Sequence, residues 1–460
     1  MKSLPVFLAV FVFLCWARTS RTPWLFFGWG FLITGLPLLR GLIGPIPVYL
    51  FDVAVCLVWT IVLTRPGISA WPQQVPPWSV LFVGILTIFG TLLPTLTYGF
   101  YPEMVWNLGH TGLAMTTIVL GAFLLRGATP AERNGIRLGI AIGLIVLAAI
   151  AILEKSSSDW NAVLVRLFYG AGDETADQSG SVAAAEVLSA LGRVSGPFGS
   201  PNTFGIVALM AALNYWLISV IDRRQSLLSY VVPASLAIVA LACGSRQVII
   251  ATGLVGLGYV MTTAPERALP RLLLGAALIA PILIFVDPSA LLDRLGNLSA
   301  GVDEANVSAR LSEGPQRFWE MLVQDPTLLF TGVGLEIQKL TRFNVDIPSE
   351  ILDGFVSNGY LLYIYFFGIF GFLVMAAFWI WVVHQGFVAP KAIRPITSGG
   401  ALALAFIVFA DNHAVLSEEL LNHIMIFVGM ITAMTTAAAP ARRLRPIRMG
   451  VPSDARRASQ

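Results

Sequence analysis

Long apolar runs separated by short polar segments recur along most of the chain. A helix of roughly 17–25 apolar residues can cross about 30 Å of hydrocarbon. Backbone groups in lipid must be hydrogen-bonded within the protein, and the alternating pattern of barrel strands is absent, so the runs predict helices. The predicted spans are 4–16, 24–39, 46–64, 78–97, 104–125, 135–153, 201–220, 228–243, 247–263, 271–286, 356–383, 397–412 and 420–438. The pattern predicts an all-α fold, a polytopic transmembrane bundle of about 12–13 spans.

The composition favours the same class of protein. Hydrophobic residues make up 56% of the 460 residues and charged residues 12%, and the mean hydropathy is +0.78. Soluble globular chains carry about 25% charged residues. The three cysteines stand in or beside apolar stretches without a CxxC pair, so no disulfide framework is predicted. The run at 4–16 lacks an A-x-A-like cleavage site and another run follows it, so we expect a retained helix.

Lysine and arginine in the short loops predict the orientation. If every span crosses once, one side receives Arg126, Arg133, Arg137, Arg223, Arg224, Arg267, Arg271, Lys391, Arg394 and the basic tail at 441–460. That side is expected to be the cytoplasm. The opposite, periplasmic side then receives residues 154–200, 243–247, 287–355 and 411–419.

These assignments divide the chain into helical regions and loops. The divisions are N-terminal helices 1–153, a periplasmic loop 154–200, central helices 201–286, a long periplasmic loop 287–355, C-terminal helices 356–440 and the tail 441–460. A loop of such length in a compact protein is usually functional or separately folded. Within it, residues 315–324 have helical spacing with Phe318, Trp319 and Leu322 on an apolar side, which predicts a short interfacial helix.

Four arginines on the predicted outer side are candidate binding residues. Arg193 precedes a span, Arg246 lies in a turn with little other polar content, and Arg310 and Arg317 lie in the long loop. An arginine at membrane depth is expensive and by default functional, and its planar fork suits bidentate binding of phosphate. Without a role in binding, Arg246 would be a snorkelling residue that anchors a helix end, and the other three would be solvated loop charges.

Several short strings, in this order and spacing, resemble the O-antigen ligase/polymerase superfamily. They are GRVSGPFGSPN at 192–202, SR at 245–246, SAR at 308–310 with RFWEML at 317–322 and DPTLLFTGVG at 325–334, and DGFVSNGYLLYIYFFGIFGFL at 353–373. The superfamily contains Wzy-type polysaccharide polymerases, lipopolysaccharide O-antigen ligases and related oligosaccharide transferases. The resemblance covers roughly residues 185–385.

The resemblance implies a metal-independent glycosyl transfer, without a cofactor, at the outer face of the bacterial inner membrane. The donor would be a glycan on undecaprenyl pyrophosphate, and an acceptor hydroxyl would displace the lipid pyrophosphate. On the family pattern, Arg193 and Arg246 match the pyrophosphate-binding arginines, and Arg310, or else Arg317, matches the arginine early in the long loop. The departing pyrophosphate needs fixed positive charge. The chain has no DxD motif to hold a metal, so the arginines are the available source of that charge.

The general base is where this sequence departs from the family. Ligases of this superfamily carry a histidine–asparagine pair at the end of the long loop, and the corresponding residues here are Ser357 and Asn358. The candidate replacements are carboxylates or a histidine near the outer face, namely Glu350, Asp353, His413, Glu418 and Glu419. For Asn202 and Asn358 we expect helix caps, although asparagine at a cleft rim can also bind sugar.

Three functions remain open on this basis. The first is a polymerase joining lipid-linked repeat units into surface polysaccharide, and the second is an O-antigen or oligosaccharide ligase with a carboxylate in place of histidine. The third is a transporter or export subunit without catalysis, which the near absence of ionisable residues from the spans disfavours, Asp52 excepted. The expected partners are the lipid-linked donor, a glycan acceptor, the bilayer and other polysaccharide assembly or export proteins, and no nucleic acid.

Overall fold

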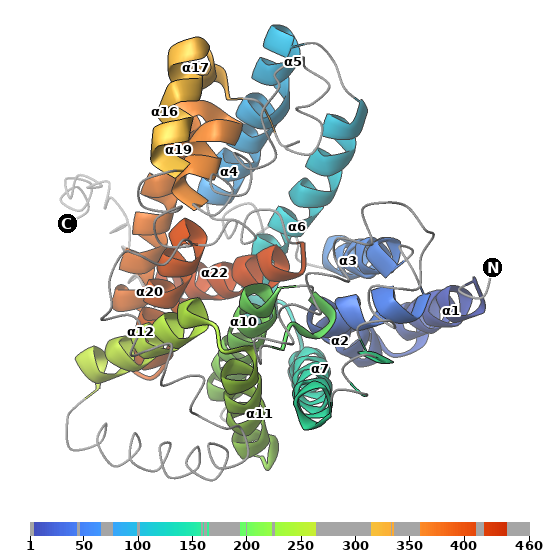
Figure 1. Ribbon diagram of the computed structural model, residues 1–460. Coiled ribbons are helices and arrows are strands. Elements are labelled where there is room, and N and C mark those ends of the chain that lie inside the picture. The colour runs from blue at the N-terminus through green and yellow to red at the C-terminus, as the bar shows by residue number, and fades with distance from the viewer. Residues whose placement is uncertain are drawn as a thin grey trace, which may run out of the picture.

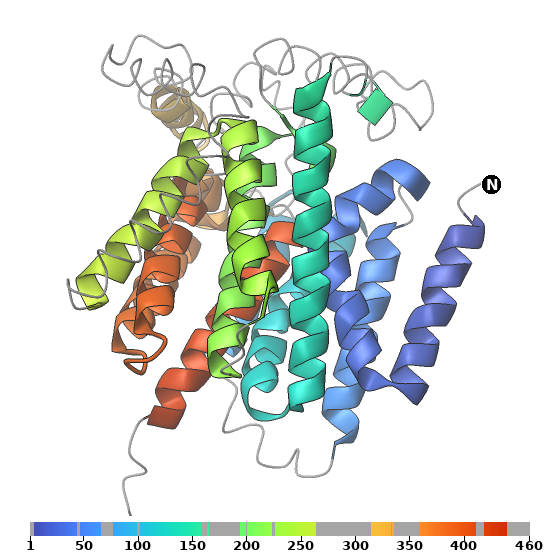
Figure 2. The same cartoon turned by 90° about the horizontal axis from the view of Figure 1, so that it is seen from below.

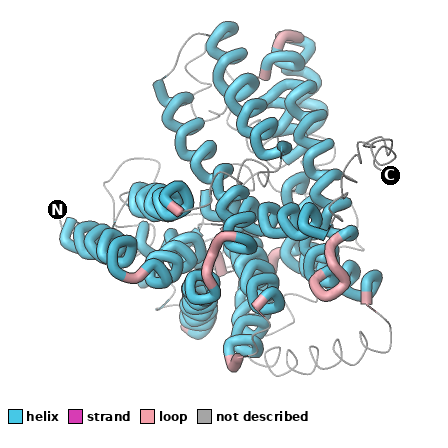
Figure 3. Tube along the Cα trace, turned by 180° about the vertical axis from the view of Figure 1, so that it is seen from behind, coloured by secondary structure: helices cyan, strands magenta, loops and turns pink. Residues whose placement is uncertain are grey.

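The computed structural model describes residues 4–43, 47–65, 77–98, 102–157, 160, 163–164, 194–198, 200–222, 226–263, 314–332, 334, 359–410 and 418–438. Within these residues the chain is helical and contains no strand (Figures 1 and 3). The elements are α1 (Leu4–Ser20), α2 (Thr22–Ile43), α3 (Pro47–Thr64), α4 (Pro77–Thr87), the π-helix η2 (Ile88–Leu92), α5 (Leu93–Tyr98), α6 (Pro102–Arg126), α7 (Pro130–Ser156), the 3-10 helix η3 (Gly196–Phe198), α10 (Pro201–Ile221), α11 (Leu228–Cys243), α12 (Arg246–Thr262), α16 (Gly314–Gln324), α17 (Leu328–Thr331), α19 (Gly359–Val388), α20 (Arg394–Ala410) and α22 (Glu418–Ala438).

The predicted all-α class is confirmed. Every predicted span overlaps a described helix except 271–286, which lies outside the described residues, and the described helix ends differ from the predicted ones by up to five residues. The span predicted at 78–97 consists of α4, η2 and α5 in succession. Cys15, Cys56 and Cys243 are free thiols, as the absence of a paired cysteine motif predicts.

Three helices are long and apolar enough to cross a membrane, by length and composition. They are Pro130–Ser156, Pro201–Ile221 and Tyr360–Val388. Shorter apolar helices surround them, and many large apolar side chains face outward, among them Leu63, Leu96 and Ile380. A soluble monomer rarely exposes apolar surface on that scale, so the exterior is compatible with a membrane protein.

Helices in this bundle approach one another closely wherever glycine faces the neighbour. The pairs are α2 with α7, α6 with α22, and α12 with α20, and a Cβ on the facing glycine would collide with the partner's backbone. The glycines concerned are Gly135, Gly139, Gly121, Gly429, Gly258 and Gly399. Small residues at helix interfaces allow this close packing, which is typical of helices within membranes. Most of α10 is buried at the centre.

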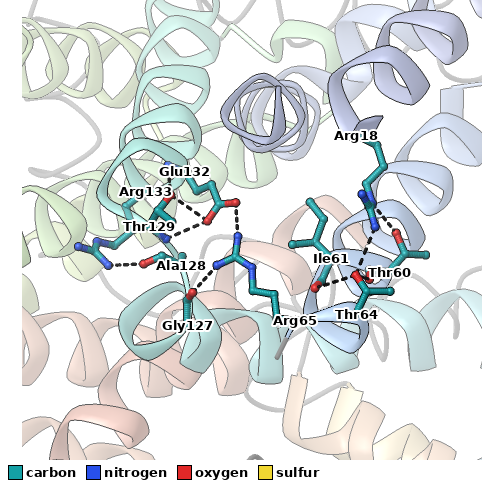
Figure 4. A network of polar contacts seen from close by, with 10 residues as sticks. All are labelled: Arg18, Thr60, Ile61, Thr64, Arg65, Gly127, Ala128, Thr129, Glu132 and Arg133. Atoms are coloured by element: carbon teal, nitrogen blue, oxygen red, sulfur yellow. Dashed lines mark hydrogen bonds and ion pairs between the residues drawn. The ribbon is translucent and has the colours of Figure 1, made fainter. Parts of the chain in front are cut away.

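A polar cluster joins several helix ends at one end of the bundle, here called the Arg133 end. Thr129 and Glu132 form a capping box at the start of α7. Arg65, which follows α3, donates a hydrogen bond to the Glu132 carboxylate. Nε of Arg133 donates to Oδ1 of Asp222 at 2.7 Å, which links α7 to the end of α10. Figure 4 shows the cluster around α7. These bonds satisfy charged groups that are mostly withdrawn from water.

The opposite end, here called the Gly244 end, contains the turn between α11 and α12. At this end α7 and α11 finish, and α10 and α12 begin. Figure 2 shows α7 upright, with the α11–α12 turn beside its last residues and the α6–α7 turn at the other extreme. The periplasmic loops predicted from the sequence would follow or precede these helix ends.

A break in α19 receives the segment that follows α17. Gly368 has φ 66° and ψ 178°, and Gly332 has φ 64° and ψ 177°, a region of backbone space open essentially only to glycine. A Cβ on Gly332 would collide with the Phe366 carbonyl, and a Cβ on Gly368 with the Phe330 carbonyl. The N–H of Gly334 also donates to the Phe366 carbonyl at 3.1 Å. Gly332, Gly334 and Gly368 therefore form an interlock between the long loop and α19.

The helix predicted at 315–324 is present as α16, Gly314–Gln324. Phe318 and Leu322 are buried, whereas Trp319 is 66% exposed and Val323 is exposed beside it. The predicted apolar side of α16 therefore has a packed part, Phe318 and Leu322, and an exposed part at Trp319, and the interfacial position of the helix stays a prediction. Figure 1 shows α16 beside α17 and α19, and Figure 2 shows it at the Gly244 end.

The interlock predicts that alanine at Gly368 or Gly332 destabilises the protein. The backbone conformation alone costs a residue with a Cβ about 1–3 kcal/mol, and the collision with a carbonyl adds to this. The melting temperature of the detergent-solubilised protein should fall for either variant.

Gly253→Ala is the matched control, because a Cβ there meets no heavy atom within 4 Å. In a helix interior this change is expected to be neutral or to stabilise by up to about 1 kcal/mol. Equal melting temperatures for Gly368→Ala and Gly253→Ala would contradict the interlock.

Candidate functional site

Two of the predicted site residues have described side chains, and both lie at the Gly244 end. Arg246 is half-buried at the first position of α12, and Asn202 is half-buried in the first turn of α10. Arg317 lies on α16 and Glu418 is the first residue of α22. Glu419 follows it as the second residue of α22. The remaining candidates lie outside the described residues, namely Arg193, Arg310, Glu350, Asp353, Asn358 and His413.

The α11–α12 turn is built by three consecutive residues. Gly244 ends α11 in the left-handed conformation, with φ 55° and ψ 31°, which glycine adopts without steric cost. Ser245 is the N-cap of α12, and its hydroxyl accepts a hydrogen bond from the N–H of Val248. Arg246 follows as the first helical residue. The sequence Gly-Ser-Arg therefore holds the arginine at a helix start, as the short turn predicts.

A hydrogen bond between side chains couples this turn to α10. The Ser245 hydroxyl donates to Oδ1 of Asn202 at 2.6 Å. The expectation that Asn202 is a helix cap was wrong, because Ser200 is the N-cap of α10 and accepts from the N–H of Thr203. Asn202 instead joins the starts of α10 and α12, so the position of Arg246 depends on contacts from both helices.

The loop before α10 connects this turn to α7. The N–H of Val194 donates to the Ala242 carbonyl near the end of α11 at 3.2 Å. Gly196 has φ 54°, and the ring of Phe204 would crowd a Cβ there. The N–H of Gly196 donates to Oε2 of Glu154 in the last turns of α7 at 3.1 Å. Residues 194–198, which follow Arg193 in the sequence, are thereby held between α7 and α11.

Glu154 is a buried acid that the sequence interpretation missed. Its residue is only 7% exposed, although it directly follows the span predicted at 135–153. The available signal was its place as the first charged residue after a long apolar run. The sequence gives no sign that Gly196 lies against it, because 42 residues separate the two.

The charges at the Gly244 end suit an anion near Arg246. The first turn of a helix presents backbone N–H groups and a partial positive charge, and α10 and α12 both begin here. The guanidinium of Arg246 adds a full, permanent charge at the start of α12. Among the described residues, no three His, Cys, Asp or Glu side chains are grouped to hold a metal ion.

A second buried polar group was also missed, within the predicted span at 420–438. His423 is fully buried, and its Nδ1 lies 3.2 Å from Nδ2 of Asn214, which also donates to the His423 carbonyl at 2.9 Å. Its Nε2 lies 3.4 Å from the Thr34 hydroxyl. The contacts join α2, α10 and α22 and satisfy both ring nitrogens within the protein, so we interpret His423 as a packing residue.

No protein-family model matches the chain, and no curated protein matches it.

The contact between Ser245 and Asn202 predicts coupled effects on stability. Ser245→Ala removes both the cap and the bond to Asn202, and should destabilise by about 1–2 kcal/mol. Asn202→Ala should cost less in this variant than in the wild-type protein, because the bond to the Ser245 hydroxyl is already gone. Melting temperatures of the two single variants and the double variant measure the coupling.

Thr129→Ala combined with Asn202→Ala is the control pair. Thr129 caps α7 at the opposite end, so these two effects should add. Additive effects for Ser245 and Asn202 as well would show that the hydrogen bond does not couple the helices.

Proposed function

We propose that this chain is a polytopic inner-membrane glycosyltransferase that joins lipid-linked glycans at the Gly244 end. The observation that carries the proposal is the position of Arg246. It stands at the start of α12 and is held through Ser245 and Asn202. The loop at 194–198, which follows Arg193, is bonded through Val194 to Ala242, four residues before Arg246. Two strings that resemble the O-antigen ligase/polymerase superfamily thus meet at one end of the bundle.

The distribution of basic residues supports a cytoplasmic Arg133 end. In the described part of the chain, the basic residues on that side are Arg18, Arg21, Arg65, Arg126, Arg133, Arg137, Lys391 and Arg394. Those on the Gly244 side are Arg40, Lys155, Arg246 and Arg317. Nη2 of Arg126 donates to the Ala433 carbonyl, so α22 ends beside α6. The basic tail after α22 would then begin in the cytoplasm and the Gly244 end would face the periplasm.

The interlock supports a fixed position for part of the long loop. Gly332 and Gly334 belong to one string of the resemblance and Gly368 to another, and their backbones are in contact. α17, Gly332 and Gly334 are therefore held against α19, so the long loop is fixed at a point between its two ends. A loop anchored in this way can cover a site at the Gly244 end and exclude water from it.

The proposed reaction is a displacement at the anomeric carbon of the donor sugar. The acceptor hydroxyl loses its proton to a base and its oxygen bonds to that carbon. The bond from the carbon to the pyrophosphate oxygen breaks, and undecaprenyl pyrophosphate leaves with the bonding electrons. Negative charge grows on the leaving group, and the fixed guanidinium of Arg246 would stabilise it, together with Arg193 and Arg310 or Arg317.

Polymerisation is the favoured form of this reaction because the histidine typical of the ligases is absent at Ser357 and Asn358. The alternative within the class is a ligase that transfers the glycan to a lipid core or a protein. The alternative of another class, a transporter or export subunit, would place ionisable groups on a path through the bundle. His423 is the buried ionisable residue closest to that description, and its ring nitrogens face Asn214 and Thr34.

The proposal predicts covalent product from purified components. The protein in detergent or vesicles, given an undecaprenyl-pyrophosphate-linked repeat unit, should release undecaprenyl pyrophosphate and produce a ladder of lengthened glycans. Arg246→Lys keeps the charge but loses the bidentate fork, and should lower the initial rate roughly 10–100-fold.

Arg21→Lys is the matched control, because Arg21 is exposed at the Arg133 end. It should retain the wild-type rate. A full rate for Arg246→Lys would make Arg246 a helix anchor only. One addition to an acceptor in place of a ladder would identify a ligase, and transfer of the lipid-linked glycan between leaflets without a new covalent bond would identify a transporter.

A further inference from the structure

The side chain of Glu154 is largely buried at the Gly244 end, where one of its two carboxylate oxygens is hydrogen-bonded. Its Oε2 accepts the N–H of Gly196 at 3.1 Å. Among the described residues, no partner is recorded for Oε1, and Oε1 is not one of the fully buried polar atoms that lack a partner. A carboxylate in the interior is expensive unless it is paired with a cation or well hydrogen-bonded, and one neutral amide supplies only part of that compensation.

Anchoring the loop does not by itself require an acid at this position. A glutamine side chain has the same length and offers an amide oxygen that can accept the Gly196 N–H equally well. Glutamine would also avoid the cost of withdrawing a carboxylate from water. The presence of glutamate therefore points to a use for its second oxygen and its ability to take up a proton.

Glu154 and Arg246 both lie at the Gly244 end. The loop that Glu154 contacts through Gly196 is bonded at Val194 to Ala242, two residues before Gly244. Glu154 lies in the last turn of α7 at this end, whereas Arg246 is the first residue of α12. Displacement of a pyrophosphate requires a proton acceptor near the attacking hydroxyl and positive charge near the leaving group. These two groups have to stand apart, because the hydroxyl attacks the carbon from the side away from the leaving group.

We propose that Glu154 is the general base of the transfer, an inference that rests on the proposed function. Oε1 takes the proton from the acceptor hydroxyl as its oxygen bonds to the anomeric carbon, and the bond to the pyrophosphate oxygen breaks. Oε2 remains bonded to the Gly196 N–H and keeps the carboxylate oriented. After the transfer, the neutral acid returns its proton to water. The acid lies on α7, outside the long loop and the last outer turn that the sequence had pointed to.

The test compares Glu154→Gln, Glu154→Asp and Glu154→Ala with the wild-type protein in the purified assay. General-base catalysis contributes about 10²–10⁴-fold, so Glu154→Gln should lose activity by that factor while its melting temperature and its Kd for the lipid-linked donor stay near the wild-type values. The acidic limb of the pH–rate profile should disappear in this variant. Added formate should restore part of the rate of Glu154→Ala, because a small carboxylate can occupy the vacated space.

Glu320→Gln is the matched control, since Glu320 is exposed on α16 and should keep the wild-type rate and pH profile. Near-normal activity of Glu154→Gln would show that the residue only anchors Gly196 and would overturn the proposal. Loss of activity with an unchanged acidic limb and no rescue by formate would also overturn it. If Glu154→Gln fails to fold, the Glu154→Asp profile decides: a shifted acidic limb supports the base and an unshifted one rejects it.

The proposed function fails separately from this inference. If the wild-type protein yields no covalent product in the assay, the proposed glycosyltransferase function is rejected, and the proposed role of Glu154 is rejected with it. A wild-type protein that makes the ladder, together with an active Glu154→Gln, leaves the glycosyltransferase intact and rejects Glu154 alone.

Discussion

The hydrogen bond from Ser245 to Asn202 fixes the geometry on which the candidate site depends. The chain reverses between α11 and α12 over Gly244 and Ser245, so there is little backbone with which to adjust the position of the next residue. The serine hydroxyl both caps α12 and binds the second residue of α10. The start of α12, where Arg246 stands, is therefore held by contacts from two helices. A flexible arginine in a long loop would lose more conformational entropy on binding an anion.

The same end of the bundle receives a carboxylate whose burial works against stability. Glu154 lies at the end of α7, and its recorded partner among the described residues is the N–H of Gly196. At the Arg133 end, by contrast, the buried Glu132 is met by Arg65 and by the capping box of α7. The two acids lie on the same helix and differ in compensation. A well-compensated acid is expected where an end of the bundle is stabilised, as at the Arg133 end. A poorly compensated acid is expected where chemistry takes place, as proposed for the Gly244 end.

The helices were predictable from the sequence because a long apolar run favours a helix, in which the backbone polar groups are bonded to one another. Each predicted span within the described residues overlaps a helix. The turn at Gly244, Ser245 and Arg246 was predictable for the same reason. Contacts between distant segments were not. Nothing in the local pattern pairs Glu154 with Gly196 or Asn202 with Ser245, and the break at Gly368 is invisible in an apolar run that continues through it. Helical spacing placed Phe318, Trp319 and Leu322 on one apolar side, but it does not tell which of them are packed, and Trp319 is exposed.

A cryo-EM structure of the protein bound to undecaprenyl pyrophosphate tests the central claim most directly. The account predicts phosphate density within about 3 Å of the Arg246 guanidinium, beside the loop at 194–198 and the first turn of α12. Phosphate density at the Arg133 end, or at the Gly244 end but out of reach of Arg246, would contradict it.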